Sequence, residues 1–276
     1  MTASPSDISA VVCTRESIET CLMSLRTAGV GQLIVVDADS IDGTREIADR
    51  YADIVLRDEG VGLGAARNVG IARTTGRLIL NMGSDNVMPP GQLQGMVNYL
   101  ERGDYAGVSA RTRVKGLGYA AQGLNSWRRG RFPSGEAGVI GTPTLFRGEL
   151  LRAHPYDSTR RFSDDSELCE RWTREFGARF AISDAEVLEM GKTTWPEVIV
   201  RCRMYGVSDA EVFVRGRQQG WSLQRQAQSL LHPLQADFVT PLRRLPAREA
   251  LAAAPFLGVF TTLRYGYWAT TALKKR

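Results

Sequence analysis

The chain has 276 residues, of which 43% are hydrophobic and 24% charged, and this composition excludes an extended disordered protein. A net charge of +5 and a pI near 9.2 favour an anionic partner: a nucleotide, a phospholipid headgroup or a nucleic acid. Two histidines and four cysteines without close pairing disfavour a zinc site and a disulfide framework, and indicate a reducing compartment such as the cytoplasm.

The first third of the sequence alternates short apolar runs with amphipathic stretches. Such alternation predicts a mostly parallel sheet with right-handed crossovers and helices on both faces. The strands expected are Ile8–Cys13, Leu33–Val36, Asp53–Leu56 and Leu78–Leu80. The helices expected between them are Ser17–Ala28, Arg45–Tyr51 and a helix within Gly60–Thr75.

Polar residues follow the second and fourth of these strands. Ligands of open α/β sheets bind at the carboxyl ends of strands, so both turns should lie on the binding edge. We expect Asp42 to cap the next helix, which leaves Asp37 and Asp39 to bind a nucleobase or ribose. Ser84 and Asp85 offer hard oxygen ligands suited to Mg²⁺ or Mn²⁺.

A glycine-rich stretch, Gly60–Asn68, precedes the third crossover helix. It departs from the dinucleotide fingerprint because Arg67 occupies the third glycine position, which disfavours a dehydrogenase. An arginine in the first turns of this helix could reach a diphosphate from the side.

A second acidic segment, Phe162–Leu168, opens an amphipathic helix. Asp164 and Glu167 have the spacing of a capping box, so a structural role accounts for Asp164. Asp165 is left without such a role, and we predict that it is chemically active.

The remainder of the chain contains further predicted elements and one basic segment. We expect a helix at Gln92–Leu100, strands at Tyr105–Ala110, Val139–Phe146 and Glu186–Met190, and a long helix at Trp195–Arg217. The arginine- and aromatic-rich stretch Gly116–Pro133 is expected to be a loop. It either contacts a phosphorylated or lipid-linked acceptor, binds nucleic acid or is simply solvated.

The C-terminal part carries the uncharged run Leu251–Leu263, followed by aromatic and basic residues. A run of this length is shorter than a membrane span. We favour a segment lying in the bilayer interface over an ordinary core helix.

Taken together, these motifs resemble those of the family 2 glycosyltransferases of the GT-A fold. The resemblance is carried by the Asp37–Thr44 turn, by Gly64, Arg67, Asn68 and Gly70, by Gly83-Ser84-Asp85, and by Pro89-Pro90. It implies that Thr14, Arg15, Asp37, Asp39 and Ser84 hold the nucleotide sugar, that Arg67 faces its diphosphate, and that Asp85 binds the metal ion. It further implies that Asp165 is the catalytic base beside Asp164, and that Glu189 stands where the family often has a metal-binding histidine.

Two positions depart from the family pattern. Ala38 replaces one acid of the strand-two motif, which leaves either Asp37 or Asp39 to bind the base. Gly83 replaces the first acid of the Asp-x-Asp metal motif, so we expect weaker metal binding.

The sequence thus predicts an α/β, GT-A-type (Rossmann-like) domain over residues 1–220 and a helical C-terminal segment over residues 221–276. The predicted reaction is metal-assisted, inverting sugar transfer from a nucleotide-diphosphate sugar, in the cytoplasm or peripherally at the inner face of the membrane. The acceptor is a lipid-linked, glycan or small-molecule hydroxyl. We expect no nucleic-acid partner, and the helical segment is expected to touch the membrane or a second copy of the chain. The alternatives are a non-catalytic nucleotide-sugar-binding scaffold and a sugar nucleotidyltransferase.

Overall fold

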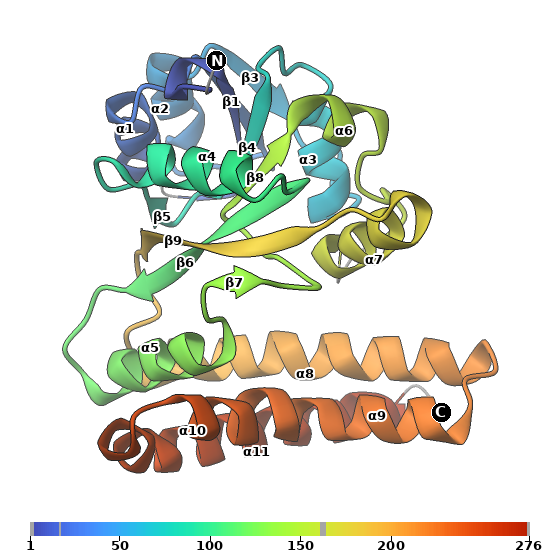
Figure 1. Ribbon diagram of the computed structural model, residues 1–276. Coiled ribbons are helices and arrows are strands. Elements are labelled where there is room, and N and C mark those ends of the chain that lie inside the picture. The colour runs from blue at the N-terminus through green and yellow to red at the C-terminus, as the bar shows by residue number, and fades with distance from the viewer. Residues whose placement is uncertain (1–2, 17, 161–163, 275–276) are drawn as a thin grey trace. The chain divides into compact units, whose positions relative to one another are not determined.

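The parallel part of the sheet is built from four strands in the first third of the chain (Figure 1). β1 (Ile8–Thr14) lies between β2 (Gln32–Asp37) and β4 (Leu78–Gly83), and β3 (Ile54–Arg57) extends the sheet beyond β2. All three pairings are parallel, as the alternating sequence predicts.

The protein is seen here in a computed structural model that describes residues 3–16, 18–160 and 164–274. Three residues of predicted elements, Ser17, Phe162 and Ser163, lie outside these ranges.

The other strands make both antiparallel and parallel pairings. β8 (Thr144–Arg147) pairs with both β4 and β6 (Gly107–Val114), while β9 (Phe180–Glu189) pairs with the short strands β5 (Asn86–Val87) and β7 (Gly135–Glu136). The order β3-β2-β1-β4-β8-β6-β9-β5 gives a mixed sheet, in which β1 to β4 pair in parallel and β8 is antiparallel to both of its neighbours. β6 and β9 run in the same direction, since the hydrogen bonds from Ala106 to Arg179 and from Arg111 to Asp184 both span 73 positions. The α/β, GT-A-type fold class is confirmed, with this mixed second half as a refinement.

Two strand predictions differ most from the structure in their limits. The expected strand Val139–Phe146 is reduced to β8, because Pro143 lacks a backbone N–H for the strand ladder. The expected strand Glu186–Met190 is the end of the longer β9.

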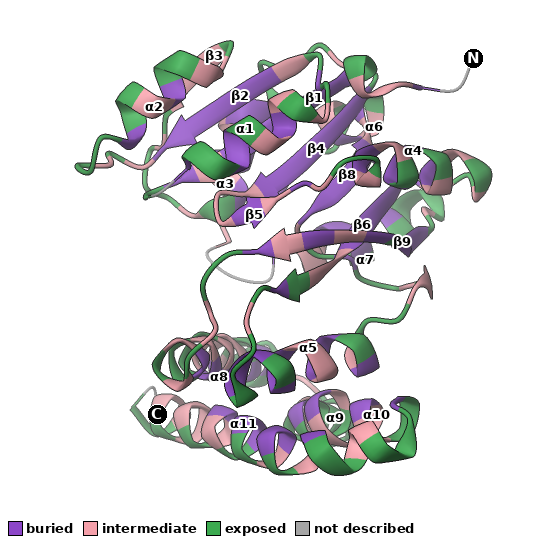
Figure 2. Ribbon diagram, turned by 90° about the vertical axis from the view of Figure 1, so that its left-hand side faces the viewer, coloured by how far each residue is buried: buried purple, intermediate pink, exposed green. Residues whose placement is uncertain are grey.

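Helices cover both faces of the sheet, and each face has its own apolar core. Successive residues of a strand point to opposite faces, so Ala10 and Val12 of β1 belong to one core and Val11 to the other. Figure 2 shows the central strands as mostly buried. The helical elements of this part of the chain are η1 (Pro5–Asp7), α1 (Glu19–Thr27), α2 (Thr44–Tyr51), α3 (Leu63–Ile71), α4 (Gln92–Arg102), α6 (Gly148–Ala153) and α7 (Asp164–Phe176).

The chain divides into two compact units at positions that differ from the predicted boundary at residue 220. The sheet unit comprises Met1–Arg113 and Ser134–Met190. The helical unit comprises Val114–Pro133 and Gly191–Arg276. The helical unit therefore contains the long helix that the sequence assigned to the catalytic domain.

The expectation that Gly116–Pro133 forms a loop is wrong. Most of it is helix α5 (Tyr119–Arg131), whose Leu124 and Trp127 are buried in the core of the helical unit. The apolar contacts that stabilise α5 come from residues more than 100 positions away, such as Phe256. The local glycine and arginine content therefore predicts a loop where packing against distant residues stabilises a helix.

The remaining helical unit consists of long helices packed around aromatic side chains. Its elements are α8 (Trp195–Gln218), α9 (Leu223–Pro233), the π-helix η2 (Leu234–Val239), α10 (Thr240–Arg244) and α11 (Ala247–Lys274). The apolar run Leu251–Leu263 lies in α11 and contributes Phe256, Leu257 and Phe260 to the core. Leu251 and Val259 of the same run are exposed by 78% and 45%. Within the part of the chain that is described, no helix has the length and apolarity needed to span a bilayer.

The π-helix has an identifiable cause and consequence. Pro241 has no backbone N–H to donate to the carbonyl four residues before it, so regular α-helical bonding is interrupted at this turn. The wider turn carries the completely buried carboxylate of Asp237, which accepts hydrogen bonds from Trp127, Arg131 and Arg264. These three donors meet the hydrogen-bonding requirement of the buried Asp237 carboxylate.

Candidate functional site

The carboxyl ends of β1, β2 and β4 form one edge of the sheet. Thr14 lies opposite Asp37, and Cys13 lies opposite Gly83, so the turns after all three strands begin at the same level. Open α/β sheets bind their ligands at such an edge. The structure therefore brings Thr14, Asp37 and the Gly83–Asp85 turn to a common edge of the sheet unit.

The acidic turn after β2 separates its two candidate carboxylates. Asp37 is buried, and the Ser40 hydroxyl lies 2.5 Å from its Oδ1 and 2.8 Å from the carbonyl oxygen of Arg15. Asp39 has a left-handed backbone (φ 55°), and its exposed carboxylate pairs with Arg57 at 2.7 Å. Asp42 accepts hydrogen bonds from the N–H and hydroxyl of Thr44, the first residue of α2, but the N-cap position itself is Gly43.

The central feature of the site is a buried ion cluster around Arg67. The guanidinium Nη1 donates to Asp164 Oδ2 at 2.7 Å and to Asp165 Oδ1 at 2.9 Å, and Nη2 donates to the Thr142 hydroxyl. The Arg67 side chain is only 5% exposed, whereas that of Asp165 is 26% exposed. Arg67, expected to face a diphosphate, is thus occupied by carboxylates of its own chain.

Tyr156 links this cluster to the strand that leads into the Gly83–Asp85 turn. Its hydroxyl lies 3.4 Å from Asp165 Oδ1 and accepts a hydrogen bond of 3.1 Å from the Asn81 amide on β4. Asn68 holds the tyrosine backbone in place, donating to its carbonyl at 2.7 Å and accepting from its N–H at 3.0 Å. The Cζ atom of the Arg67 guanidinium also lies 5.1 Å from the centre of the Tyr156 ring.

Burial and neighbouring charge shift the ionisation of the cluster. Burial raises the pKa of Asp165 above the usual aspartate range; Arg67 opposes this shift and Asp164 adds to it. Burial also raises the pKa of Tyr156 well above its ordinary value, so its hydroxyl keeps its proton. Burial would lower the pKa of Arg67, but the charges of Asp165 and Asp164 raise it by more, so Arg67 stays cationic.

The metal-site candidates lie on neighbouring segments. Asn86 pairs with Glu189 across β5 and β9, and the N–H of Met190 donates to the carbonyl of Asp85 at 2.7 Å. Asp85 and Glu189 are therefore brought to the same corner of the sheet, with Glu189 buried. Their carboxylate oxygens have the chemistry that Mg²⁺ and Mn²⁺ prefer. Among the described residues no group of three or more His, Cys, Asp or Glu is arranged to hold a metal ion.

The structure suggests why glycine occupies the first position of the metal motif. A Cβ added at Gly83 would lie 2.9 Å from Asp85 Oδ1 and 3.0 Å from Asn86 Oδ1. Any larger residue would require both side chains to move. Gly83 thus allows the Asp85 side chain to fold back over the end of β4.

Three residues in contact with the site were not singled out from the sequence. Tyr156, Asn81 and Thr142 are polar residues in segments that read as loop or strand, and no local pattern marks them. Each contacts Arg67, Asp165 or Tyr156 only through folding of distant segments.

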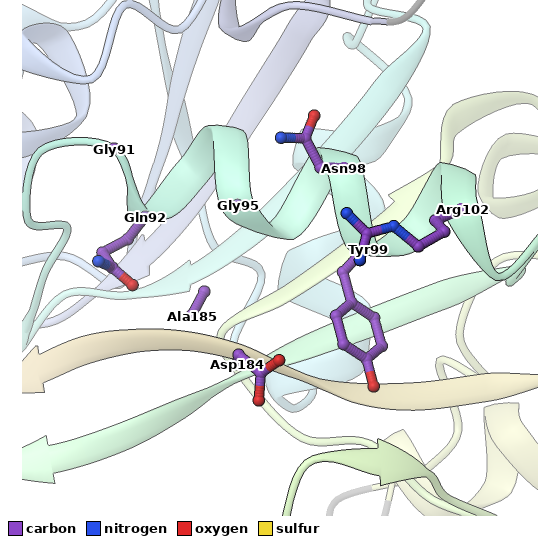
Figure 3. A pocket seen from close by; sticks show the side chains of 8 residues that line it. All are labelled: Gly91, Gln92, Gly95, Asn98, Tyr99, Arg102, Asp184 and Ala185. Atoms are coloured by element: carbon purple, nitrogen blue, oxygen red, sulfur yellow. The ribbon is translucent and has the colours of Figure 1, made fainter.

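A surface groove lies elsewhere on the sheet unit, between α4 and β9 (Figure 3). It encloses about 300 Å³, and none of the predicted site residues line it. Its lining residues are Gly91, Gln92, Gly95, Asn98, Tyr99, Arg102, Asp184 and Ala185.

A mixed sheet of this order, with acidic turns at the carboxyl ends of its parallel strands, is the architecture of the GT-A glycosyltransferases. The sequence profile described as Glycosyl transferase family 2 matches residues 9–181, and the chain belongs to this family. The predicted family resemblance is confirmed.

Curated relatives match part of the chain. The succinoglycan biosynthesis protein ExoO of Rhizobium meliloti (strain 1021) is 34% identical over 111 residues, which are 37% of this chain and 31% of ExoO. The amylovoran biosynthesis glycosyltransferase AmsE of Erwinia amylovora is 29% identical over 94 residues, 31% of this chain and 35% of AmsE. These matches span about a third of each relative's length.

Among solved structures, the mannosyltransferase PcManGT from Pyrobaculum calidifontis, in complex with GDP-Man and Mn²⁺, has the same fold. Its TM-score is 0.64 at 18% sequence identity, covering 99% of this chain and 87% of that one. At this identity the likeness establishes the fold and leaves the choice of substrate open.

Proposed function

We propose that this protein transfers a sugar from a nucleotide-diphosphate sugar to an acceptor hydroxyl with inversion at the anomeric carbon. Family membership supports the reaction class, and the acidic edge of the sheet supports a nucleotide-sugar donor. The GDP-Man and Mn²⁺ bound by PcManGT are consistent with such a donor and a divalent metal ion.

The observation that carries the proposal is the position of Asp165. Its Oδ1 is held by Arg67 and Tyr156, which orients the carboxylate and leaves Oδ2 as the oxygen available to an acceptor. A Cβ at Gly141 would lie 3.9 Å from Oδ2, so the glycine keeps space beside this oxygen. Asp165 would take the proton of the acceptor hydroxyl as that oxygen attacks the sugar.

The raised pKa of Asp165 fits this role. A general base is most effective when its pKa approaches the working pH, and an ordinary aspartate is too weak a base. Arg67 opposes the rise in the pKa of Asp165 and fixes the direction of its carboxylate. We therefore assign Arg67 to positioning the base, with Asp164 as its second carboxylate partner.

The donor would lie along the carboxyl edge of the parallel strands. Asp37, buried at the end of β2, is the better placed of the two acids to receive hydrogen bonds from the base or ribose, with Thr14 and Arg15 beside it. Asp39 and Ser84 would contact more exposed parts of the nucleotide.

A divalent metal ion would be held by Asp85 and Glu189, together with diphosphate oxygens of the donor. When bound, it would offset the negative charge that develops on the leaving nucleoside diphosphate. With two protein carboxylates, metal affinity would depend strongly on the presence of the nucleotide.

Release of nucleoside diphosphate tests the proposal without knowledge of the acceptor, because water can replace the acceptor hydroxyl. GDP-mannose and a panel of UDP-sugars would be incubated with the full chain and Mn²⁺. We expect Asp165→Asn to lower the release rate by about 10²-fold or more while donor binding, measured by calorimetry, is retained. Asp49→Asn, which removes an exposed carboxylate on α2, is the matched control and should keep wild-type release.

Release at the wild-type rate by Asp165→Asn would remove Asp165 from the role of base. Donor binding without release by the wild-type protein, with every donor of the panel, would instead favour a nucleotide-sugar-binding scaffold.

A further inference from the structure

Charge is divided unequally between the two compact units. The helical unit contains 17 Lys and Arg against 5 Asp and Glu, a net charge of +12. The sheet unit contains 18 Lys and Arg against 25 Asp and Glu, a net charge of −7. The modest overall charge of +5 conceals this difference.

Most acids of the helical unit are engaged within it. Asp209 and Asp237 form ion pairs with Arg264, and Glu249 pairs with Arg129. Glu197 accepts hydrogen bonds from three backbone N–H groups at the start of α8. The surface of the unit is correspondingly dominated by positive charge.

Helix α9 and the first residue of η2, Leu234, present an apolar stripe to solvent, called here the α9 stripe. Leu223, Ala227, Leu230, Leu231 and Leu234 recur at positions i, i+4, i+7, i+8 and i+11, which places them on one helix face. The exposed fractions of the four leucines are 83%, 36%, 49% and 40% in chain order. Pro233 is the one buried residue within α9. An amphipathic helix whose apolar face is exposed lacks the partner that such a face normally has.

Basic and aromatic side chains lie next to this stripe in the chain. Arg217 and Arg225 are exposed on either side of the turn that leads into α9. The Arg225 guanidinium lies 5.2 Å from the ring centre of Trp221, which is half-buried at the same turn. Leucines flanked by arginine and tryptophan are typical of helices that lie in a membrane interface.

We propose that the helical unit binds the surface of an anionic lipid bilayer, with the α9 stripe inserted among the lipids and the surrounding arginines against their headgroups. Each basic residue near such a surface strengthens binding by about fivefold, and the exposed leucines add the apolar contribution. The Leu251–Leu263 run, expected from the sequence to make this contact, contributes Phe256, Leu257 and Phe260 to the core instead.

Charge complementarity decides between a bilayer and a second copy. An isologous dimer through this face would bring two units of +12 together, which costs electrostatic energy. A nucleic acid would satisfy the arginines and leave the leucines of α9 without apolar contacts. Anionic lipid satisfies both features.

Vesicle sedimentation tests the proposal with the full chain and without any substrate, so its result is independent of the proposed reaction. We expect binding to phosphatidylcholine vesicles containing 30% phosphatidylglycerol, and at least tenfold weaker binding to pure phosphatidylcholine. Raising the salt concentration from 0.1 to 0.5 M should also weaken binding at least tenfold.

Two double variants separate the apolar and electrostatic contributions. Leu223→Ser with Leu231→Ser should lower vesicle affinity at least tenfold at all salt concentrations, and Arg217→Glu with Arg225→Glu should abolish the preference for phosphatidylglycerol. The matched control, Met23→Ser with Arg45→Glu, changes exposed residues of the sheet unit and should bind as wild type does. All changed side chains are exposed, and circular dichroism confirms folding.

The proposal is overturned if the wild-type protein fails to bind anionic vesicles, or if the control variant loses binding as strongly as the α9 variants. It is also overturned if a lipid-free dimer, seen by analytical ultracentrifugation, is lost with Leu223→Ser and Leu231→Ser, since the stripe would then face a second copy. Tighter binding of a 20-nucleotide RNA than of anionic vesicles has the same consequence.

Discussion

The guanidinium of Arg67 lies 2.9 Å from Oδ1 of Asp165, although 98 positions separate the two residues in the chain. This contact joins the glycine-rich crossover helix α3 to the start of α7. It also offsets part of the rise that burial imposes on the pKa of Asp165, because a buried cation lies beside the carboxylate.

Replacing Arg67 by methionine should destabilise the protein by about 3–5 kcal/mol, because Asp164 and Asp165 would be left in the site without their counter-ion. The matched control is Arg57→Met. It breaks the exposed ion pair between Arg57 and Asp39, whose N–O distance of 2.7 Å equals that between Arg67 and Asp164. That change should cost about 1 kcal/mol or less. Urea unfolding measures both, and equal losses would show that burial of the Arg67 cluster is energetically unimportant.

The Arg67→Met deficit should also depend on pH. Without the cation, nothing would oppose the rise that burial imposes on the pKa of Asp165, so this carboxyl group would favour folding only when protonated. The deficit should therefore be small near pH 4 and grow as the pH rises to 7. A deficit that is constant over this range would indicate lost packing as its cause.

Removing the hydroxyl of Tyr156 tests its role as a positioning residue. Tyr156→Phe deletes a hydrogen bond to Asp165, so the pKa of Asp165 should rise further and the acid limb of the pH–rate profile should move to higher pH. Nucleoside diphosphate release at pH 7 should fall about 2- to 10-fold, as expected for the loss of one long hydrogen bond of 3.4 Å. The control Tyr99→Phe lies on α4, away from the cluster, and should leave both the rate and the profile unchanged. A lower rate with an unshifted acid limb would contradict the positioning role.

The space around Gly83 gives a test of the metal site. In Gly83→Ala the new Cβ would displace the side chains of Asp85 and Asn86, and we expect the Mn²⁺ concentration for half-maximal release to rise about tenfold. Gly95→Ala is the control, since the nearest atom to its Cβ would be 3.9 Å away. Asp85→Asn should have a larger effect on Mn²⁺ than Gly83→Ala. An unchanged Mn²⁺ requirement in both variants would exclude Asp85 as a ligand.

The parallel half of the sheet was predictable because its information is local. Apolar runs such as Leu33–Val36 alternate with helical periodicity, and each polar turn follows directly from its strand. The carboxyl edge carrying Thr14, Asp37 and Asp85 follows from that alternation alone.

The remaining features depend on contacts between distant segments. The sequence of β8 contains nothing that sets its direction, and its antiparallel pairing with β4 follows from the whole sheet order. The partners of Arg67 lie 75 to 98 positions away, which is why a diphosphate-facing arginine was expected. Helix α5 joins the helical unit for the same reason, since Trp127 packs against Phe260 and donates to Asp237.

The start of helix α8 provides a prediction about stability and pH. The Glu197 carboxylate accepts hydrogen bonds from the backbone N–H groups of Lys192, Thr193 and Thr194, and from the hydroxyl of Thr194. These bonds, led by that from the Thr194 hydroxyl, lower the pKa of Glu197 to about 2. A folded-state pKa below the unfolded value stabilises the protein above the unfolded pKa, and the effect is lost as the pH falls through the folded value.

Glu197→Gln should therefore destabilise the helical unit by about 1 kcal/mol at pH 7, a value typical of a helix cap whose partly exposed carboxylate is screened by solvent. The difference from the wild type should persist down to about pH 4.5, the ordinary glutamate range, and disappear as the pH approaches 2. Urea unfolding followed by far-UV circular dichroism measures the difference at each pH, with Glu211→Gln as a control further along α8. If the wild type and Glu197→Gln differed equally at pH 7 and pH 3, neutralisation of the carboxylate would not be the cause, and the glutamine itself would be disrupting the turn before α8.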